Sequence, residues 1–301
     1  MAEIRPAADS DIELWVDVFN RVERVPLMVE AVRDWRPREQ TLLDLLALED
    51  GRAVGVGRVF EPGDMRGRGV AAAFVGVLAE TRGRGVGTAL YRGVSEHARA
   101  LGKDELQGET WEDEHEALAY FGRRGFREIE RFDCVRLDLT AASVPEPAPP
   151  AGVELVTRAE RPDLVPAMYE VALEAWPDMP SEDPLGASYD DWYGFEILHA
   201  ARRADLTFLA LADGEVVGYA SAYANPGRED AWHLMTGVKK RWRRRGVASA
   251  LKAAQIRAAR DAGFRGLVTF NEMRNEPMRA LNARLGYRPL PAQIRLRGPV
   301  A

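Results

Sequence analysis

The apolar residues change their period at one point in the first half of the chain. Residues 71–78 (AAAFVGVL) are uncharged and indicate a strand. Beyond them, apolar side chains recur every four residues, at Val86, Leu90, Val94 and Ala98. This spacing marks one face of an α-helix, and Gly102 is its expected C-terminal cap. The pattern therefore predicts a strand that runs through a short loop into a long helix.

Two aspartate-glycine steps, Asp50-Gly51 and Asp213-Gly214, lie between apolar alternations and are strong hairpin signals. Strands are expected around them, over residues 54–60 and 208–223. Helical stretches come first in each half, over residues 11–20 and 162–175. Because the strands group before the long helix, a mixed sheet is favoured over a doubly wound parallel one.

The second half of the chain repeats the first. An offset of 161 aligns VGVLAETRGRGVGTAL (75–90) with TGVKKRWRRRGVASAL (236–251), and an offset of 163 superposes the two aspartate-glycine turns. We interpret this as a tandem duplication. The expected fold class is α/β (α+β), with two tandem modules that each hold a mixed central β-sheet flanked by helices.

A proline-rich segment separates the repeats. Residues 141–152 (AASVPEPAPPAG) contain four prolines, which cannot donate to a helix or a sheet ladder. The expected domains are therefore residues 1–140 and 153–301, each folding as its own module, with an extended linker between them.

Composition narrows the classes of function. The formal charge of -6 argues against a general nucleic-acid binder. The single cysteine, Cys134, cannot form an internal disulfide and is more typical of a core residue. No apolar run of about 18 residues is present, and the N-terminus lacks the blocks of a secretion signal. We expect a cytoplasmic protein, monomeric or homodimeric, with no membrane or nucleic-acid partner and no metal site.

The word Arg-Gly-Arg-Gly occurs twice, at 66–69 and 82–85. The first copy precedes a strand, so we interpret it as a surface turn. The second precedes the long helix, where free amide protons and glycines can cradle an anion. The second half repeats this cradle at 243–248. A dinucleotide fingerprint would need glycine at Thr88, and no GxxxxGK[ST] stretch occurs.

These residues resemble a known family. Arg82-x-x-Gly85-x-Gly87 and Arg243-x-x-Gly246-x-Ala248, each with a valine five residues earlier, resemble the acyl-CoA signature of the GNAT superfamily of N-acetyltransferases. Residues 271–287 resemble its second signature, and residues 116–126 are the corresponding stretch of the first half. The tandem arrangement is similar to that of mycothiol synthase.

The resemblance implies transfer of an acetyl group from acetyl-CoA to an amine of a small-molecule acceptor. It assigns the diphosphate to two runs of residues: Arg82, Gly83, Arg84, Gly85, Val86, Gly87 and Thr88, and Arg243, Arg244, Arg245, Gly246, Val247, Ala248 and Ser249. It places the pantetheine arm along Val77 and Leu78, or along Val238 and Lys239. Asn275, in the second signature, joins the cofactor-binding set.

The catalytic groups depart from the superfamily's pattern. The usual tyrosine acid is replaced by Phe121 in the first half and Asn282 in the second, and the usual strand glutamate by Ala71 and Trp232. Alternation along the strand puts His233 opposite Trp232 and Thr236, and a structural role for this histidine is favoured. The remaining polar candidates for catalysis are Thr236, Asn271, Glu272 and Asn282, with His233 as the group of suitable pKa.

Acceptor recognition is expected in residues 176–196, where aromatic and acidic residues alternate. The aromatic residues are Trp176, Tyr189, Trp192, Tyr193 and Phe195, and the acidic ones are Glu182, Asp183, Asp190, Asp191 and Glu196. Aromatic faces with carboxylates suit a cationic amine. A core role for the aromatics, with solvated acids, is an equal alternative.

The second half is expected to perform the chemistry. It keeps Asn271 and Asn275, where the first half has Thr110 and Glu114, and a carboxylate at 114 would repel phosphates if it faced them. The alternatives are a catalytically weak module that binds acyl-CoA or a partner, and a nucleic-acid-binding protein that uses the arginine words.

Overall fold

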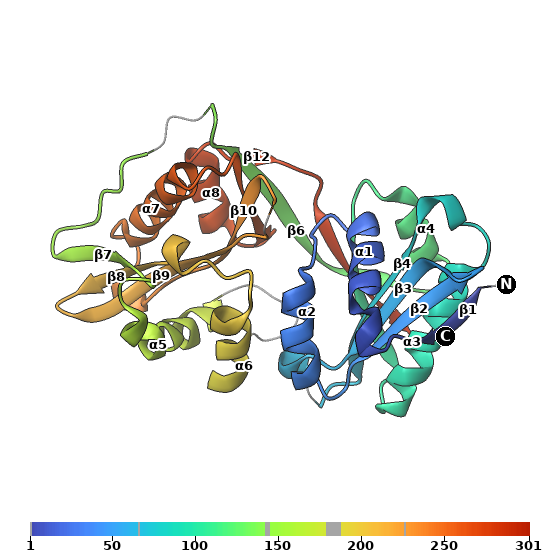
Figure 1. Cartoon of the computed structure of the whole chain (residues 1–301). Coiled ribbons are helices and arrows are strands. Elements are labelled where there is room, and N and C mark those ends of the chain that lie inside the picture. Colours follow the sequence, from blue (N-terminus) through green and yellow to red (C-terminus); the bar gives the residue numbers. More distant parts are fainter. Residues whose placement is uncertain (1, 66, 142–144, 179–187, 226) are drawn as a thin grey trace. The chain divides into compact units, whose positions relative to one another are not determined.

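The computed structural model describes residues 2–65, 67–141, 145–178, 188–225 and 227–301. Within them the chain forms two compact units (Figure 1). Unit 1 contains Met1–Glu130 and Gln293–Ala301, and unit 2 contains Arg131–Ala292.

Unit 1 is a mixed sheet with helices on both faces. Its strands are β1 (Glu3–Pro6), β2 (Leu43–Glu49), β3 (Arg52–Phe60), β4 (Val70–Val77), β5 (Glu105–Trp111) and β13 (Gln293–Pro299), side by side in that order. Its helices are α1 (Ile12–Val22), α2 (Val29–Trp35), α3 (Val86–Ala100) and α4 (His115–Gly122). Neighbouring strands are antiparallel except β4 and β5, which are parallel.

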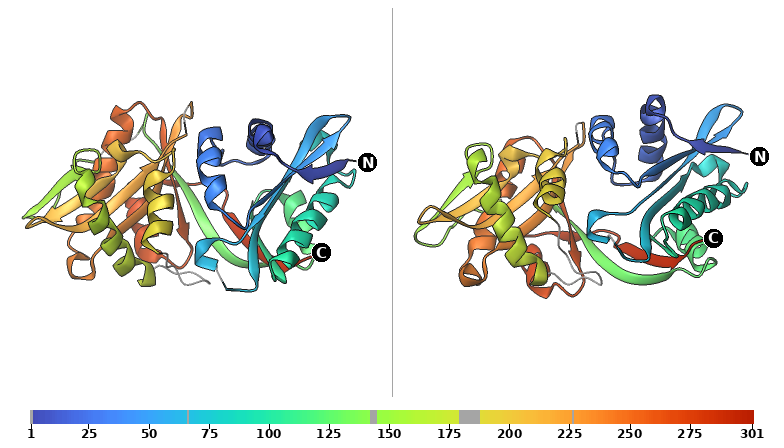
Figure 2. Two further views of the ribbon diagram at one scale, coloured as in Figure 1. Left: turned by 60° about the horizontal axis from the view of Figure 1, so that its bottom comes forward. Right: turned by 90° about the horizontal axis from the view of Figure 1, so that it is seen from below.

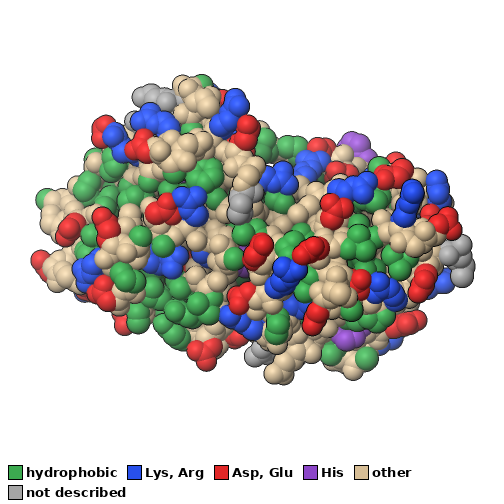
Figure 3. Space-filling model, viewed as in Figure 1, with side chains coloured by type: hydrophobic (Ala, Val, Ile, Leu, Met, Phe, Trp, Pro, Cys, Tyr) green, Lys and Arg blue, Asp and Glu red, His purple; other side chains and the backbone are tan. Residues whose placement is uncertain are grey.

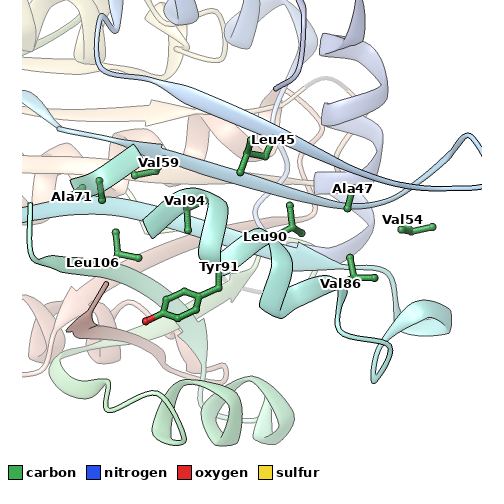
Figure 4. Packing of buried hydrophobic residues seen from close by; sticks show 11 residues of the cluster. Leu45, Ala47, Val54, Val59, Ala71, Val86, Leu90, Tyr91, Val94 and Leu106 are labelled. Carbon is green, nitrogen blue, oxygen red and sulfur yellow. The ribbon is translucent and has the colours of Figure 1, made fainter. Parts of the chain in front are cut away.

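Alternating side chains build a core on each face of this sheet. Leu45 packs with Val86, Leu90 and other residues of α3 (Figure 4), whereas its neighbour Leu46 packs with Trp15 and other residues of α1. The two helices therefore cover opposite faces, as Figure 2 shows. The four-residue apolar spacing predicted α3 correctly, and Gly102 follows it with a φ of +74°.

Unit 2 repeats this plan. Its strands lie in the order β6, β11 (Gly266–Glu272), β10 (Asp230–Val238), β9 (Glu215–Tyr223), β8 (Phe208–Ala212) and β7 (Val153–Thr157), with β6 covering Arg127–Asp138 and the short β12 (Arg288–Pro289) beside β6. Its helices are α5 (Val165–Ala175), α6 (Tyr189–Tyr193), the π-helix Gly194–Leu198, α7 (Val247–Asp261) and α8 (Glu276–Arg284).

The faces of unit 2 alternate in the same way. Along β8, Leu209 packs with Met168 and Trp192 from α5 and α6, and Ala210 packs with Leu251 from α7. The expected mixed sheets flanked by helices are thus present in both units. Both aspartate-glycine steps form the predicted hairpin turns, with Asp50 and Asp213 each at a φ of +50°.

The closing strands are exchanged between the halves of the sequence. β13, from the end of the chain, pairs with β5 of unit 1 from Gln293 opposite Trp111 to Pro299 opposite Glu105. The last seven residues of β6, Phe132–Asp138, come from the first half and pair with β11 of unit 2. The predicted ranges 1–140 and 153–301 divide the chain at one segment, whereas each compact unit includes a strand from the other half. Residues 142–144 of the predicted linker lie outside the described residues.

A strand pair separates at the same place in each unit. β4 and β5 pair only at residues 70–72 and 105–107, although both strands continue for several residues. β10 and β11 likewise pair only at residues 230–232 and 266–268. In each unit the two parallel strands therefore stop pairing after three residue pairs, on the side where β4 or β10 leads into the next helix.

Candidate functional site: a cavity and a repeated anion cradle at helix N-termini

The opening in unit 1 is a cavity of about 1050 Å³. Its walls come from β4 (residues 73–77) and β5 (residues 108–111), its upper end from the loop and first turn of α3, and one side from α4. Of the residues expected to bind the cofactor in the first half, the cavity is lined by Val77, Arg82, Gly83, Gly85, Val86, Gly87 and Thr88. Leu78 is instead buried in the core under α1.

The start of α3 has the geometry of an anion cradle. Gly83 and Gly85 have φ of +77° and +88°, which a side chain at Cβ disfavours. Gly85 caps the helix, and Ala89 donates the first intrahelical bond, to the Gly85 carbonyl at 3.0 Å. The N–H groups of Val86, Gly87 and Thr88 have no acceptor in the helix, and the positive end of the helix dipole lies there.

The two arginines of this word hold the loop. The Arg82 Nε donates to the Val77 carbonyl (3.2 Å), and its guanidinium pairs with Glu116 on α4 (3.3 Å). Arg84 donates to the Glu80 carbonyl (3.1 Å) and does not line the cavity. Arg82 therefore connects the end of β4 to α4 across the mouth of the cavity.

Two cavity residues, Tyr120 on α4 and Arg124 in the turn after it, have no counterpart in the sequence prediction. The Tyr120 hydroxyl donates to the Gly87 carbonyl (2.8 Å), and burial raises the pKa of this tyrosine. The Arg124 guanidinium stacks 3.5 Å from the centre of the Tyr120 ring and donates to Thr88 Oγ1 (2.8 Å). The superfamily's tyrosine was sought at Phe121, one residue later, so the prediction missed Tyr120. Phe121 itself faces Gly108 at the floor of the cavity.

The start of α7 in unit 2 repeats the backbone of the cradle. Gly246 caps the helix at a φ of +92°, and Ala250 donates to its carbonyl at 3.0 Å. Arg244 stands where the first half has Gly83 and also has a positive φ, of +57°. Val247 is buried, and Ala248 and Ser249 are half-buried in the first turn.

The basic residues beside α7 are engaged with neighbours. Arg243 donates to the Val238 carbonyl (2.9 Å), as Arg82 does in unit 1, and pairs with Asp178 (2.7 Å). Lys239 is buried beside Glu215 (2.9 Å), and Arg245 lies over the Trp242 ring (5.0 Å). Lys239 and Arg243 are thus held by their neighbours, whereas Lys240, Arg241, Arg244 and Arg245 are exposed.

A pair of asparagines lies in unit 2 beyond the residues at which β11 pairs with β10. Asn282 on α8 donates to Asn271 Oδ1 on β11 (3.2 Å), and both side chains are buried. Asn271 Nδ2 and Asn282 Oδ1 have no partner among the described residues. Asn275 caps α8 by accepting from the Met278 N–H (3.4 Å). The side chain of Glu272, another predicted candidate, lies outside the described residues.

The sequence predicted that Thr236 shares a face of its strand with Trp232, opposite His233, and this prediction was wrong. Directly opposed residues of an antiparallel pair share a face, and β10 pairs His233 with Ala222 and Thr236 with Ala220, with a β-bulge between. Ala222 and Ala220 both belong to the cores under α7. The bulge adds one residue, so Thr236 lies on the face of His233 and opposite that of Trp232.

His233 has a structural environment. It is buried and hydrogen-bonded to Gln255 and to the Tyr287 hydroxyl. Burial, with Lys252 nearby, lowers the pKa of the imidazole well below its usual range. The structural role favoured for this histidine agrees with these contacts.

The first Arg-Gly-Arg-Gly word leads directly into a strand, as expected. Gly67 has the positive φ of a turn (+75°), and β4 begins at Val70. Arg66 lies outside the described residues. No helix follows this word, so its amides are not aligned as those of the second copy are.

The expected acceptor region is partly described. Residues 179–187, with Glu182 and Asp183, lie outside the described part. Trp192 is buried in the core with Tyr169, whereas Phe195 is 58% exposed. Glu196 is 4% exposed, so a solvated acid does not describe it.

Solved structures share this architecture. The chain resembles a tandem GNAT protein from the clavulanic acid biosynthesis pathway (TM-score 0.81, 23% identity, 100% of this chain and 99% of that one). It also resembles a GCN5-related N-acetyltransferase from Sphaerobacter thermophilus (TM-score 0.73, 21% identity, 99% and 96%) and a putative acetyltransferase from Pyrococcus horikoshii (TM-score 0.59, 18% identity, 100% and 90%). At these identities the likeness is one of fold.

Sequence comparison gives the family. Among curated protein sequences, none matches the chain significantly. Within the described residues, no helix has both the length and the apolar character needed to cross a bilayer. The model of the acetyltransferase (GNAT) family matches twice, at residues 11–126 and 165–287, which together cover most of both repeats. The chain therefore belongs to the acetyltransferase (GNAT) family, as a member with two tandem modules.

Proposed function

We propose that the protein transfers an acetyl group from acetyl-CoA to an amine of a small-molecule acceptor. Both units bind acetyl-CoA at their helix starts, and the second half performs the reaction. The observation that carries the cofactor assignment is the cavity of about 1050 Å³ at the start of α3. It combines three amide donors, a helix dipole and apolar strand walls in one space, which fits a diphosphate joined to an extended arm.

In this proposal the amides of Val86, Gly87 and Thr88 hold the diphosphate, and the open edge of β4 near Val77 holds the pantetheine arm. When bound, the thioester supplies an activated acetyl group. Its leaving group is the coenzyme A thiol, which has a pKa of about 8.5 and leaves without strong acid assistance. The chain supplies orientation through Arg82 and Tyr120, which fix the loop and the first turn of α3. In the second half, the amides of Val247, Ala248 and Ser249 at the start of α7 hold the diphosphate of the acetyl-CoA that reacts.

The bulge in β10 supports assigning the chemistry to the second half. β10 has nine residues, and β4, which pairs with β3 in unbroken register, has eight. A bulge frees backbone groups and redirects side chains, and bulges are frequent beside active sites. Here it places Met235 N–H against the Ser221 hydroxyl (3.2 Å).

The position in unit 1 that corresponds to Ser221 holds a buried, paired arginine. By the hairpin offset of 163, Arg58 corresponds to Ser221. Its guanidinium is bidentate to Asp44 (2.7 and 3.0 Å) and stacks between Trp15 (4.1 Å) and Trp35 (5.0 Å). A buried, paired cation has no free group for proton transfer, so we assign unit 1 to cofactor binding.

Two alternatives differ in what supports them. The residues Phe121 and Asn282 at the acid positions favour a weakly catalytic module that binds acyl-CoA. On the face in Figure 3, basic and acidic side chains are intermixed, which does not favour nucleic-acid binding on that face. A cytoplasmic location and a monomeric or homodimeric state stay predictions.

Matched charge substitutions test the division of labour. Gly87 and Ala248 are both second residues of their helices, where glutamate suits the helix dipole but repels a diphosphate. Gly87→Glu should weaken acetyl-CoA binding to unit 1 by about a hundredfold and leave turnover intact. Ala248→Glu should abolish turnover. Calorimetric titration with acetyl-CoA and thiol release with a panel of primary amines measure the two effects.

The glutamine variants at the same positions control for side-chain size. Both should bind and turn over nearly as the unchanged protein does, since they add no charge. Loss of turnover in Gly87→Glu alone would show that the first half is the active one. Unaltered binding in both glutamate variants would remove the cradle assignment.

A further inference from the structure

A carboxyl group is buried on the α5 and α6 face of the sheet in unit 2. Glu196 lies in the π-helix that follows α6, and such helices often occur at functional sites. Its side chain packs where the core of Trp192, Tyr219 and Met235 lies, and Oε1 has no partner among the described residues. Burying a carboxyl group this deeply costs folding free energy unless all of its oxygens have partners, so an oxygen without one suggests a function.

Glu196 lies beside the residue that faces the bulge of β10. Alternation along β9 puts Tyr219, Ser221 and Tyr223 on one face, and the Ser221 hydroxyl acts on the Glu196 carboxyl. Ser221 Oγ also accepts from the Met235 N–H in the bulge (3.2 Å), and the Tyr219 hydroxyl donates to Met235 Sδ (2.7 Å). Ser221 is therefore a bridge between the carboxyl and the irregular part of β10.

Among the ionisable groups around Glu196, its own carboxyl is the one whose pKa lies near neutrality. Burial raises the pKa of Glu196 to about 7, against the opposing effects of Ser221, Arg202 and Arg158. The Tyr219 and Tyr223 hydroxyls stay neutral because burial raises their pKa above the usual value, and the two arginines stay charged. The carboxyl thus loses its proton in the pH range where a general base works best.

We propose that Glu196, acting through the hydroxyl of Ser221, accepts the proton that the acceptor amine loses when it attacks the thioester. This inference rests on the proposed function and supplies the base that the family's usual position lacks. The amine nitrogen forms a bond to the acetyl carbon and the carbon–sulfur bond breaks. The nitrogen's proton passes to Ser221, whose own proton passes to Glu196. The thiolate leaves and takes up that proton, so the products are the acetylated amine and the free thiol.

Glu196→Gln keeps the size of the side chain and removes the base. Thiol release from acetyl-CoA is measured against pH with water, ethanolamine, glycine and 2-phenylethylamine as acceptors. In the unchanged protein kcat/KM should rise as pH increases through about 7. Glu196→Gln should lower kcat by about a hundredfold or more and remove this inflection, with acetyl-CoA affinity unchanged. Glu196→Asp should restore part of the rate together with the inflection.

Ser221→Ala provides a second route should the first variant fold poorly. It should lower kcat and leave the cofactor affinity unchanged, whereas the control Glu154→Gln, an exposed acid on β7, should behave as the unchanged protein. An unchanged rate and pH profile in Glu196→Gln would overturn this assignment alone. A protein that binds acetyl-CoA but releases no thiol with any acceptor would overturn the proposed function as well.

Discussion

Lys252 is a residue whose ordinary chemistry is changed by its position. It lies on α7, fully buried, with its ammonium nitrogen 5.5 Å from the centre of the Tyr287 ring. Burial lowers its pKa from 10.5 to about 7. The folded protein therefore releases this proton at a pH where the unfolded chain still holds it.

Lys252→Met should stabilise the protein, most strongly at low pH. Between pH about 7 and 10.5 the unfolded chain binds more protons at this site, so the stability of the unchanged protein rises with pH there. Below about 7 the full penalty is present. We expect a gain of about 3 to 5 kcal/mol near pH 6 that shrinks toward pH 10, measured by urea unfolding. Lys240→Met, at an exposed lysine, should show no such trend. A gain that is equal at every pH would contradict the lowered pKa.

At the scale of an element, the fit of β13 depends on one glycine. A Cβ at Gly298 would lie 2.4 Å from Phe126 Cγ and 2.8 Å from the Phe126 backbone. Gly298→Ala should therefore destabilise unit 1 by about 1 to 3 kcal/mol, measured by denaturant unfolding. Gly122→Ala is the matched control, because nothing lies within 4 Å of that Cβ and alanine favours a helix. Equal stability of the two variants would mean that β13 does not pack against Phe126.

At the scale of the whole molecule, the exchanged strands make the stability of unit 1 depend on the end of the chain. β13 pairs with β5, its Pro299 carbonyl accepts from the Tyr91 hydroxyl (2.6 Å), and Arg295 pairs with Glu109 (2.8 Å). Deleting residues 293–301 should expose the edge of β5. Limited proteolysis with mass spectrometry should then find cleavage within residues 1–130, with residues 131–292 protected.

A linear division of the chain predicts the opposite result. If the halves folded separately, the deletion would expose sites in the second half and leave the first protected. Replacing residues 141–152 by a glycine-serine tract of equal length is the control, because the linker is expected to act as a spacer. That variant should show the protection of the unchanged protein in both units.

The sequence by itself determined the features that depend on neighbours along the chain. The change from an uncharged strand to a four-residue apolar spacing predicted β4 and α3, and the repeat carried the same prediction to β10 and α7. Gly85 and Gly246, which the sequence placed in the two anion cradles, lie at the helix starts with φ of +88° and +92°, a conformation that costs glycine little. These signals are local, so they can be read from one segment of the sequence without knowing which strands or helices it packs against.

Only the tertiary structure decided which strand closes each sheet, which way Thr236 faces and how deeply Glu196 is buried. A strand's pattern gives its period but not its partner, so β13 and β6 could not be assigned to units from sequence. The bulge in β10 follows from its register against β9, and it reverses every face prediction beyond it. The acidic residues of 176–196 look alike in sequence. The packing of α6, β9 and the π-helix separates Glu196 from its exposed neighbours, because desolvation depends on all the elements around a group at once.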